Sequence, residues 1–231
     1  MQQSSKDAVI AWLKGRPIKS VLDAPSGDGW SKEALPPDAE VDGIDLYAQP
    51  EGRYRKFWQH DLDTPLPKDC GKYDLICCCE GLEHLGNPLL FLREVHRLLA
   101  DDGLLVVTTP NAWYPQSRLQ FLHRGFFPSF PPLAGKVVPG SHMHITPWTY
   151  PQPYVYLKLA GFKPPQILPE ELSKAKHLHE RLLAWPARLY CRGREKRATT
   201  EETRAYWQAA GSDASLLGRH LTTVTSKATA P

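Results

Sequence analysis

The sequence predicts an α/β fold in which helices cover both faces of a mostly parallel sheet. Strand-like and helical segments alternate along the 231-residue chain. The segment 73–79 is an unbroken apolar run after Asp74, which is typical of a strand buried on both faces of a parallel sheet. Residues 19–29 form a short apolar run and then a turn of small residues, and a turn at the end of a first strand is where nucleotide-like ligands bind.

Seven segments have the β-branched, apolar or alternating composition of strands. They are residues 19–24, 41–45, 55–59, 73–79, 104–108, 165–168 and 220–226. The alternation of these strands with helical segments is the reason for expecting parallel pairing.

Helices are predicted from apolar spacing and from start and stop residues. An amphipathic helix over 5–14 ends at Gly15, and a short helix from Trp30 ends at Pro36-Pro37. A third helix begins at Asn87-Pro88, because proline suits the first turn, and Asp102-Gly103 ends it. A fourth covers 151–160 after Thr149, a plausible N-cap, and ends at Gly161.

Two segments exceed this alternating core, so we expect one domain over 1–231 with insertions at 111–147 and 170–213. The first insertion is rich in aromatic residues, prolines and histidines. The second contains a basic helical stretch that Pro186 interrupts.

Composition is that of a globular protein, with 42% hydrophobic and 23% charged residues. The net charge of +3 is too small to indicate a nucleic-acid partner by itself. Cys77, Cys78 and Cys79 are consecutive in an apolar run, which favours buried reduced thiols over disulfides or zinc ligands. We therefore expect a cytoplasmic protein, with neither a signal-peptide core nor a membrane-spanning run.

The turn after the first strand places Asp23, Pro25, Gly27 and Gly29 at every second position. Glycine lets the backbone turn sharply and approach a ligand, because it has no Cβ. The pattern resembles the first motif of class I S-adenosylmethionine-dependent methyltransferases, D/E-x-G-x-G-x-G, although Pro25 stands where the first glycine usually falls. The nicotinamide-type fingerprint G-x-G-x-x-G fits worse, since counting from Gly27 puts Lys32 at its last glycine.

Residues 73–111 resemble the same family more closely, with Tyr-Asp-Leu-Ile-Cys-Cys-Cys-Glu-Gly-Leu-Glu-His-Leu-Gly-Asn-Pro, a helix, Asp-Asp-Gly, a strand and Thr-Pro-Asn in order. With the other motifs the resemblance covers nearly all of 19–165. It implies a Rossmann-like, doubly wound sheet of seven strands with an antiparallel last strand. It also implies that S-adenosylmethionine is the cofactor.

The resemblance assigns cofactor contacts to the ends of three strands. Asp45 ends the second strand 22 residues after Asp23, where a carboxylate accepts ribose hydroxyls, with a solvated strand end as the alternative. Asp61 corresponds to the family's acceptor for the adenine amine and Leu62 to the residue that packs on the ring, with a plain turn as the alternative. The full predicted set is Asp23, Ala24, Pro25, Gly27, Gly29, Asp45, Leu46, Asp61, Leu62 and Glu80.

The segment from Glu80 to His84 begins at the end of the strand 73–79, where the transferred methyl group is expected. Its two carboxylates and its imidazole converge only if the segment turns helically. Glu-x-x-Glu-His resembles the divalent-metal motif of ubiquinone-pathway O-methyltransferases and small-RNA 2′-O-methyltransferases, and the latter add a histidine in a His-x-x-x-Trp-Thr context. The ligands carried over are Glu80, Glu83, His84 and His144, with His142 as a substitute for His144.

Carboxylate and imidazole ligands suit Mg²⁺, Mn²⁺, Fe²⁺ or Zn²⁺ alike. A cation there lowers the pKa of an attacking hydroxyl. The same motif also occurs in methyltransferases without a metal, where Glu80 meets the cofactor and His84 caps, packs or serves as a general base. Catalytic roles are therefore expected for His84, Glu80 and His144.

The implied function is O-methylation of a hydroxyl on a saccharide, a lipid-linked molecule or another small acceptor. The segment 111–147 is then an acceptor lid, in which Asn111 either orients the acceptor or only makes a turn. One alternative is an RNA 2′-O-methyltransferase, which the modest charge and the lack of a recognisable RNA module disfavour. The other is a cofactor-binding subunit without catalytic activity.

Residues 172–204 combine many arginines and lysines with leucines and aromatics. This composition predicts peripheral contact with an anionic membrane, at its inner face, with a solvated face over a packed stripe as the alternative. Nothing in the sequence indicates an oligomeric state.

Overall fold

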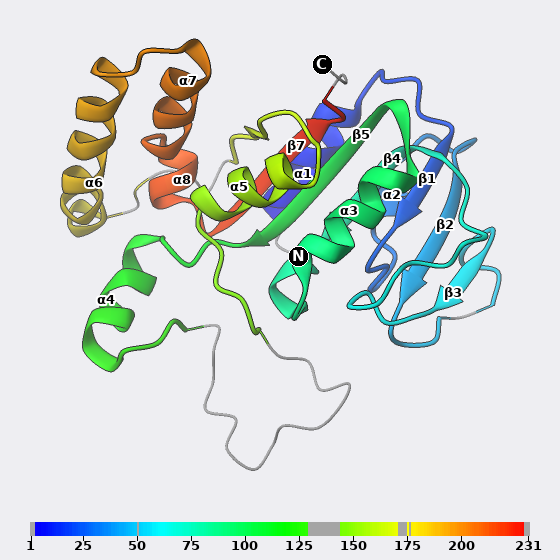
Figure 1. Ribbon diagram of the computed structural model, residues 1–231. Helices are drawn as coiled ribbons and strands as arrows, with labels where there is room; N and C mark the ends of the chain where they lie inside the picture. The colour runs from blue at the N-terminus through cyan, green and yellow to red at the C-terminus, as the bar shows by residue number, and fades with distance from the viewer. Residues whose placement is uncertain (1–2, 50, 129–143, 171–174, 176, 229–231) are drawn as a thin grey trace.

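The computed structural model describes residues 3–49, 51–128, 144–170, 175 and 177–228, and they form an α/β structure around a seven-stranded sheet (Figure 1). The strands are β1 (Ser20–Asp23), β2 (Glu40–Asp45), β3 (Phe57–Gln59), β4 (Tyr73–Cys79), β5 (Leu99–Pro110), β6 (Gln166–Ile167) and β7 (His220–Ser226). Their order across the sheet is β3-β2-β1-β4-β5-β7-β6. Pairing is parallel from β3 to β5, and β7 runs antiparallel to both β5 and β6. The predicted fold class is confirmed.

The helices are α1 (Gln3–Leu13), α2 (Ser31–Ala34), α3 (Pro88–Leu98), α4 (Pro115–Arg124), α5 (Pro151–Leu159), α6 (Leu178–Lys196), α7 (Glu201–Ala210) and α8 (Asp213–Leu217). A single 3₁₀ turn, η1 (Leu82–His84), follows β4. The helices α3 and α5 cover one face of the sheet and α1 and α2 the other, and a separate apolar core fills each interface. Strands β2 and β3 are added on one side of β1, and β4 and β5 on its other side, so the strand order reverses next to β1. In such folds ligands bind at this point, in a crevice at the carboxyl ends of the strands, which here are those of β1, β2 and β4.

The apolar strand β4 contributes to both cores, as its sequence predicts. Cys78 packs into the α3–α5 side, and Cys77 and Cys79 pack into the α1–α2 side. All three thiols are buried and outside any disulfide, which confirms their predicted burial.

The junction between α3 and β5 differs from the prediction. The helix ends at Leu98 rather than at Asp102-Gly103, and the strand predicted over 104–108 begins at Leu99 and continues to Pro110. The early start is possible because Leu99 pairs with Tyr73 before the register shifts. Gly103 permits this, since a Cβ there would lie 2.7 Å from Leu99 Cγ and 2.9 Å from the Tyr73 carbonyl oxygen.

The insertion after β6 contains α6 and α7, which pack on each other and on α8 beside the β7–β6 side of the sheet (Figure 1). The predicted interruption at Pro186 is wrong, because α6 is a continuous helix through that residue. None of the helices in the described part of the chain is long and apolar enough to span a bilayer.

Candidate active site

Asp23 ends β1 as a fully buried carboxyl group. Its Oδ2 accepts hydrogen bonds from the Ser31 hydroxyl at 2.5 Å and the Tyr54 hydroxyl at 3.1 Å. Burial raises the pKa of Asp23 to about 7, although these two hydrogen bonds oppose the shift. Asp23 therefore anchors the start of the turn from inside the protein.

The turn after Asp23 lies against the carboxylate that ends β2. Gly27 and Gly29 have φ values of +48° and +73°, which favour glycine. The Gly27 amide donates to Asp45 Oδ2 at 2.9 Å, and the Tyr47 amide donates to Asp45 Oδ1 at 3.0 Å. The Ser26 hydroxyl also donates to Asp45 Oδ2, at 3.5 Å. Each carboxylate oxygen has about two acceptor sites, so Oδ1 can still accept a ligand hydroxyl. The glycine turn and the predicted ribose acceptor are thus brought together.

Two side chains that sequence reasoning missed hold this turn. The Gln49 amide donates to the Gly27 carbonyl oxygen at 2.9 Å, and Arg53 Nη1 donates to Gln49 Oε1 at 3.1 Å. Arg53 also covers Gly29 closely, since a Cβ on Gly29 would lie 2.6 Å from Arg53 Nε. No local pattern distinguishes these residues, because they belong to the irregular segment between β2 and β3.

The predicted adenine contacts follow β3. Asp61 is exposed and accepts the Asp63 amide at 2.9 Å, while Leu62 is buried within the α3–α5 core. Asp63, which was not predicted, accepts the amides of Gly86 and Asn87 at 2.9 and 2.7 Å. The loop after β3 is therefore tied to the loop after η1. The remaining predicted contacts are Ala24, which is buried in the core beside Asp23, Pro25, whose peptide bond with Ala24 is cis, and Leu46, which is exposed beside Asp45.

Glu80 begins the segment after β4 with an unusual φ of +54°. Its amide donates to the Thr108 carbonyl oxygen at 2.9 Å, and the Thr108 hydroxyl donates to Glu80 Oε1 at 3.0 Å. His220 Nε2 lies 3.3 Å from Glu80 Oε2. Burial alone would raise the pKa of Glu80, but the contacts with His220 and Thr108 outweigh it and hold this pKa below its usual value.

Sequence reasoning missed His220. It is the first residue of β7 and pairs with Pro110, the last residue of β5. The antiparallel direction of β7 therefore brings its first residue to the edge where the parallel strands end. His220 could have been found from two predictions taken together. The strand predicted over 220–226 begins at His220, and the resemblance implied that this last strand is antiparallel.

Glu83, His84 and His144 form a separate cluster in which the candidate ligand atoms lie within 4.8 Å of one another. The two imidazole ring centroids are 4.8 Å apart. The Glu83 carbonyl oxygen accepts the amides of Ile145 and Thr146 at 2.7 and 3.1 Å, which brings the segment carrying His144 to η1. Glu80 is not in this group, so the predicted set of four ligands becomes three. His142 lies outside the described residues.

The Glu83 carboxyl group is buried, and neither oxygen has a hydrogen-bond donor within the described part of the chain. Burial, and secondarily the charge of Glu80, raise the pKa of Glu83 to about 8. A buried carboxyl group without donors is unfavourable unless it is protonated or meets a cation. This chemistry suits either a proton or a bound metal ion.

The β1 turn and the β4 turn touch each other. A Cβ on Gly81 would lie 2.3 Å from Pro25 Cδ, so only glycine fits between Glu80 and Leu82 without moving the loop. The glycine turn, the Glu80–His220 pair and the Glu83–His84–His144 cluster are therefore parts of one continuous region.

Asn111 does not have the predicted freedom to orient an acceptor. Its buried amide nitrogen donates to the carbonyl oxygens of Ser215 and Gly218 at 2.9 and 2.8 Å, and its oxygen accepts the Trp113 amide at 2.9 Å. Asn111 instead holds α8 and the residues between α8 and His220. Trp148, which directly follows the predicted lid, is buried in the core.

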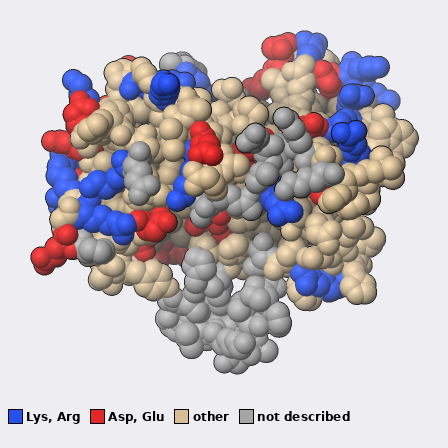
Figure 2. All heavy atoms as spheres, turned by 180° about the vertical axis from the view of Figure 1, so that it is seen from behind, with Lys and Arg blue, Asp and Glu red and all other residues tan. Residues whose placement is uncertain are grey.

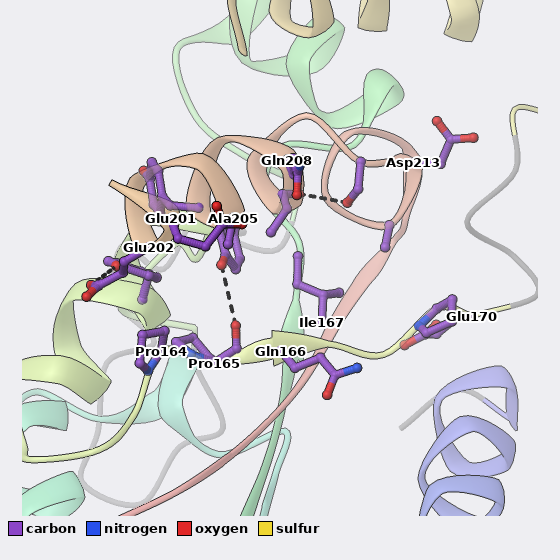
Figure 3. A pocket seen from close by; sticks show the side chains of 17 residues that line it. Pro164, Pro165, Gln166, Ile167, Glu170, Glu201, Glu202, Ala205, Gln208 and Asp213 are labelled. Atoms are coloured by element: carbon purple, nitrogen blue, oxygen red, sulfur yellow. Dashed lines mark hydrogen bonds between the residues drawn. The ribbon is translucent and has the colours of Figure 1, made fainter. Parts of the chain in front are cut away.

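A separate cavity of about 890 Å³ lies between β6, α5, α7 and α8 (Figure 3). Tyr150, Tyr154 and Tyr206 form part of its wall, and Glu170 and Glu202 also line it. Its lining comes from residues 150–170 and 201–214, and includes neither the glycine turn nor the carboxyl ends of β1, β2 and β4. The cavity is therefore distinct from the candidate active site.

A seven-stranded sheet with an antiparallel β7, and an acid at the end of β2 facing a glycine turn after β1, define the class of S-adenosylmethionine-dependent methyltransferases called class I. Within that class, this chain belongs to the family described as methyltransferase domain, whose model matches residues 5–211.

Relatives in two bacteria are ubiquinone biosynthesis O-methyltransferases. Those of Pseudomonas paraeruginosa (strain DSM 24068 / PA7) and Dechloromonas aromatica (strain RCB) are 30% and 32% identical to this chain, each over 107 residues. The match covers 40% of this chain and 45% of each relative, so the chain spans a little under half the length of these relatives.

Solved structures share the fold over nearly the whole chain. A Haloferax volcanii chain from a complex with the Trm112 methyltransferase activator is 14% identical with a TM-score of 0.58, and the match covers 99% of this chain and 90% of that chain. A SAM-dependent methyltransferase of Archaeoglobus fulgidus is 16% identical with a TM-score of 0.55, with coverage of 96% and 94%. Likeness at these identities supports the fold.

Proposed function

We propose that this protein transfers the methyl group of S-adenosylmethionine to a hydroxyl oxygen of a saccharide, a lipid-linked molecule or another small acceptor. The observation that carries the proposal is the contact between the glycine turn at Pro25 and the acid–imidazole region that begins at Glu80. Imidazoles and carboxylates suit removal of a hydroxyl proton. The O-methyltransferase names of the partial relatives support oxygen as the acceptor atom.

The residues around the glycine turn would hold the methyl donor. Asp45 accepts a ribose hydroxyl, while the bare backbone at Gly27 and Gly29 allows close approach. Asp61 accepts from the adenine amine, and Leu46 and Leu62 supply apolar contact. Pro25 and Glu80 complete the donor-facing wall, and the buried Asp23 and Ala24 support it from behind. The donor supplies a methyl group already activated by its sulfonium, so the protein has to align the acceptor, exclude water and take up a proton.

His84 is the proposed base for that proton. Its side chain is partly exposed, and its ring lies against His144, which orients it. Glu80, kept ionised by His220 and Thr108, faces the region of the sulfonium and stabilises positive charge there. His144 belongs to the first insertion, the predicted acceptor lid over 111–147, so acceptor binding and the base are coupled through that segment.

Glu83, His84 and His144 also fit a divalent cation such as Mg²⁺, Mn²⁺, Fe²⁺ or Zn²⁺. The fit rests on the mixed oxygen and nitrogen donors and on the two Glu83 oxygens that lack donors within the described residues. A bound cation would supply Lewis acidity that lowers the pKa of an acceptor hydroxyl. In that case both imidazoles are ligands, and Glu80 remains with His220 outside the ligand set.

The acceptor class is tested by incubating cell extracts with the purified protein and a radiolabelled methyl donor. Labelled saccharide or lipid is expected, and labelling should be lost with Asp45→Ala. Labelled RNA without labelled saccharide or lipid would reverse the choice in favour of 2′-O-methylation. If the protein binds the donor but labels nothing, the alternative of a non-catalytic subunit replaces the proposal.

A further inference from the structure

The helix α6 exposes its apolar side. Leu178, Leu182, Trp185 and Leu189 follow the spacing i, i+4, i+7 and i+11, which places them on one face. Their exposed fractions are 73%, 63%, 61% and 45%, in that order. An apolar stripe on a surface helix normally faces the core, so this orientation is the reverse of the usual one.

Small residues on the opposite face of α6 explain the orientation. Ala184 packs with Leu216 and Leu217 of α8, and Cys191 packs with Ala210 of α7. Small side chains let the helices approach closely, and the large apolar side chains then point outward. The stripe is therefore exposed in the folded insertion because α6 is held by its other side.

Charge on α6 is divided in the same way. Its two acids face the protein. Glu180 accepts a hydrogen bond from the His177 backbone amide at 3.1 Å, as part of the N-terminal cap. Glu195 accepts one from the Gln208 side-chain amide at 2.9 Å. Arg181, Arg192 and Lys196 are exposed on the side of the apolar stripe. Within the described residues, the ion pair made by α6 is that of Arg188 with Asp213, so these three cations can meet an outside anion.

The neighbouring helix α4 also exposes apolar residues. Arg118 of α4 donates to the Leu183 carbonyl oxygen of α6 at 2.8 Å, so the two helices are in contact. On α4, Leu122 is 83% exposed and Phe121 is also exposed. Seen from behind, blue side chains gather at the upper right, where the end of α6 lies, above a largely tan surface (Figure 2).

We propose that the outward face of α6 binds an anionic lipid surface. Leucines and Trp185 would enter the boundary between headgroups and acyl chains, while Arg181, Arg192 and Lys196 would meet the phosphates. Long basic side chains can keep their charges at the headgroups while their stems lie on apolar surface. The combination of an apolar stripe with cations, and the absence of acids on that face of α6, favours anionic lipid over a neutral protein partner.

The test is sedimentation of the full chain with vesicles of phosphatidylcholine alone and of phosphatidylcholine with phosphatidylglycerol. The wild type should bind the anionic vesicles roughly tenfold more tightly or better, because each basic side chain near such a surface adds to the affinity. High salt should weaken this binding. Equal binding to both vesicles, or binding to neither, would overturn the proposal.

Two variants and one control distinguish binding by the outward face of α6 from nonspecific binding to vesicles. The double variant Leu182→Ser with Trp185→Ser should lose most binding, and Arg192→Ser with Lys196→Ser should lose the preference for anionic lipid. The control is Leu159→Ser, which changes an apolar residue of α5 that is 60% exposed. Circular dichroism should be unchanged for all of them, since the altered side chains are exposed.

Full binding by the Leu182→Ser/Trp185→Ser variant would disprove the role of α6. A wild-type dimer in light scattering that becomes monomeric in this variant, without vesicle binding, would assign the face to a second copy and also overturn the proposal. Binding is measured without a methyl donor, so its failure leaves the proposed methyl transfer untouched.

Discussion

His220 Nε2 lies 3.3 Å from Glu80 Oε2, so the first residue of β7 is joined to the turn after β4. The contact spans the carboxyl edge of the sheet, with Thr108 of β5 as the second partner of the same carboxylate. Glu80 is thereby held with an unusual backbone angle beside the glycine turn. This three-residue arrangement separates Glu80 from the Glu83–His84–His144 cluster, although all the acids come from one short segment.

Removing the His220 imidazole should destabilise the fold. His220→Ala leaves the Glu80 carboxylate with Thr108, and losing a partly buried hydrogen bond to a charged group costs about 1–3 kcal/mol in free energy of unfolding. The loss should be greatest near pH 7 and should shrink as the pH falls through the lowered pKa of Glu80, where the carboxylate is protonated. Denaturant titration at several pH values measures it. His123→Ala, at an exposed position on α4, is the control, and equal losses in both variants would contradict the pair.

Asp45→Ala should weaken donor binding by roughly 10- to 100-fold, because a hydrogen-bonded charged group contributes about 1.5–3 kcal/mol. Calorimetry with S-adenosylmethionine and its demethylated product measures the affinity. Asp38→Ala is the matched control, since Asp38 is an exposed acid just before the other end of β2. Unchanged affinity in Asp45→Ala would remove the ribose assignment.

Gly81→Ala should disturb the site more than its size suggests. The added methyl group would lie 2.3 Å from Pro25 Cδ, and overpacking of this kind costs about 1–3 kcal/mol of stability. Because the loop has to move, donor affinity should fall as well. In Gly71→Ala the new Cβ meets nothing within 4 Å, so this control should retain both properties. Thermal unfolding and calorimetry together decide the outcome, and two variants that behave alike would argue against the contact.

Asp23 should make the free energy of unfolding depend on pH. Its pKa is about 7 in the folded protein and 3.8 in its ordinary state, so folding favours the protonated carboxyl group. The resulting stability is fully present below pH 3.8 and is lost as the pH rises through 7. Asp23→Asn cannot titrate there, so its stability should fall less than that of the wild type between pH 5 and pH 8. Denaturant titration at each pH measures this change. Equal changes in the free energy of unfolding between pH 5 and pH 8 for the two proteins would refute the expectation.

Metal analysis distinguishes the two proposed states of the Glu83 cluster. If the cluster binds a cation, purified protein should contain it, and Glu83→Ala and His144→Ala should each lower both the content and the activity. Glu80→Gln should retain the metal, because Glu80 lies outside the three-residue group. Metal-free protein whose activity resists a chelator would leave His84 as the base and eliminate the cation.

Local patterns predicted most of the secondary structure. The limits of β4 and β7 match the predicted 73–79 and 220–226, because apolar and alternating runs carry their own period. The end of α3 was misplaced because Asp102-Gly103 is a plausible stop, whereas pairing of Leu99 with Tyr73 already draws the chain into the sheet. Pro186 did not break α6, because tertiary packing can override the local cost of proline within a helix.

By itself the sequence determined the α/β fold, the glycine turn and the strand ends at which a ligand site forms, since these depend on short-range spacing. Only the tertiary structure decided which acid meets which imidazole: Glu80 pairs with His220, which is distant in sequence and arrives through antiparallel pairing of β7. It also decided that the leucines of α6 face outward, because small residues on the other side of the helix allow closer packing. Both outcomes depend on contacts between remote segments, which local spacing does not encode.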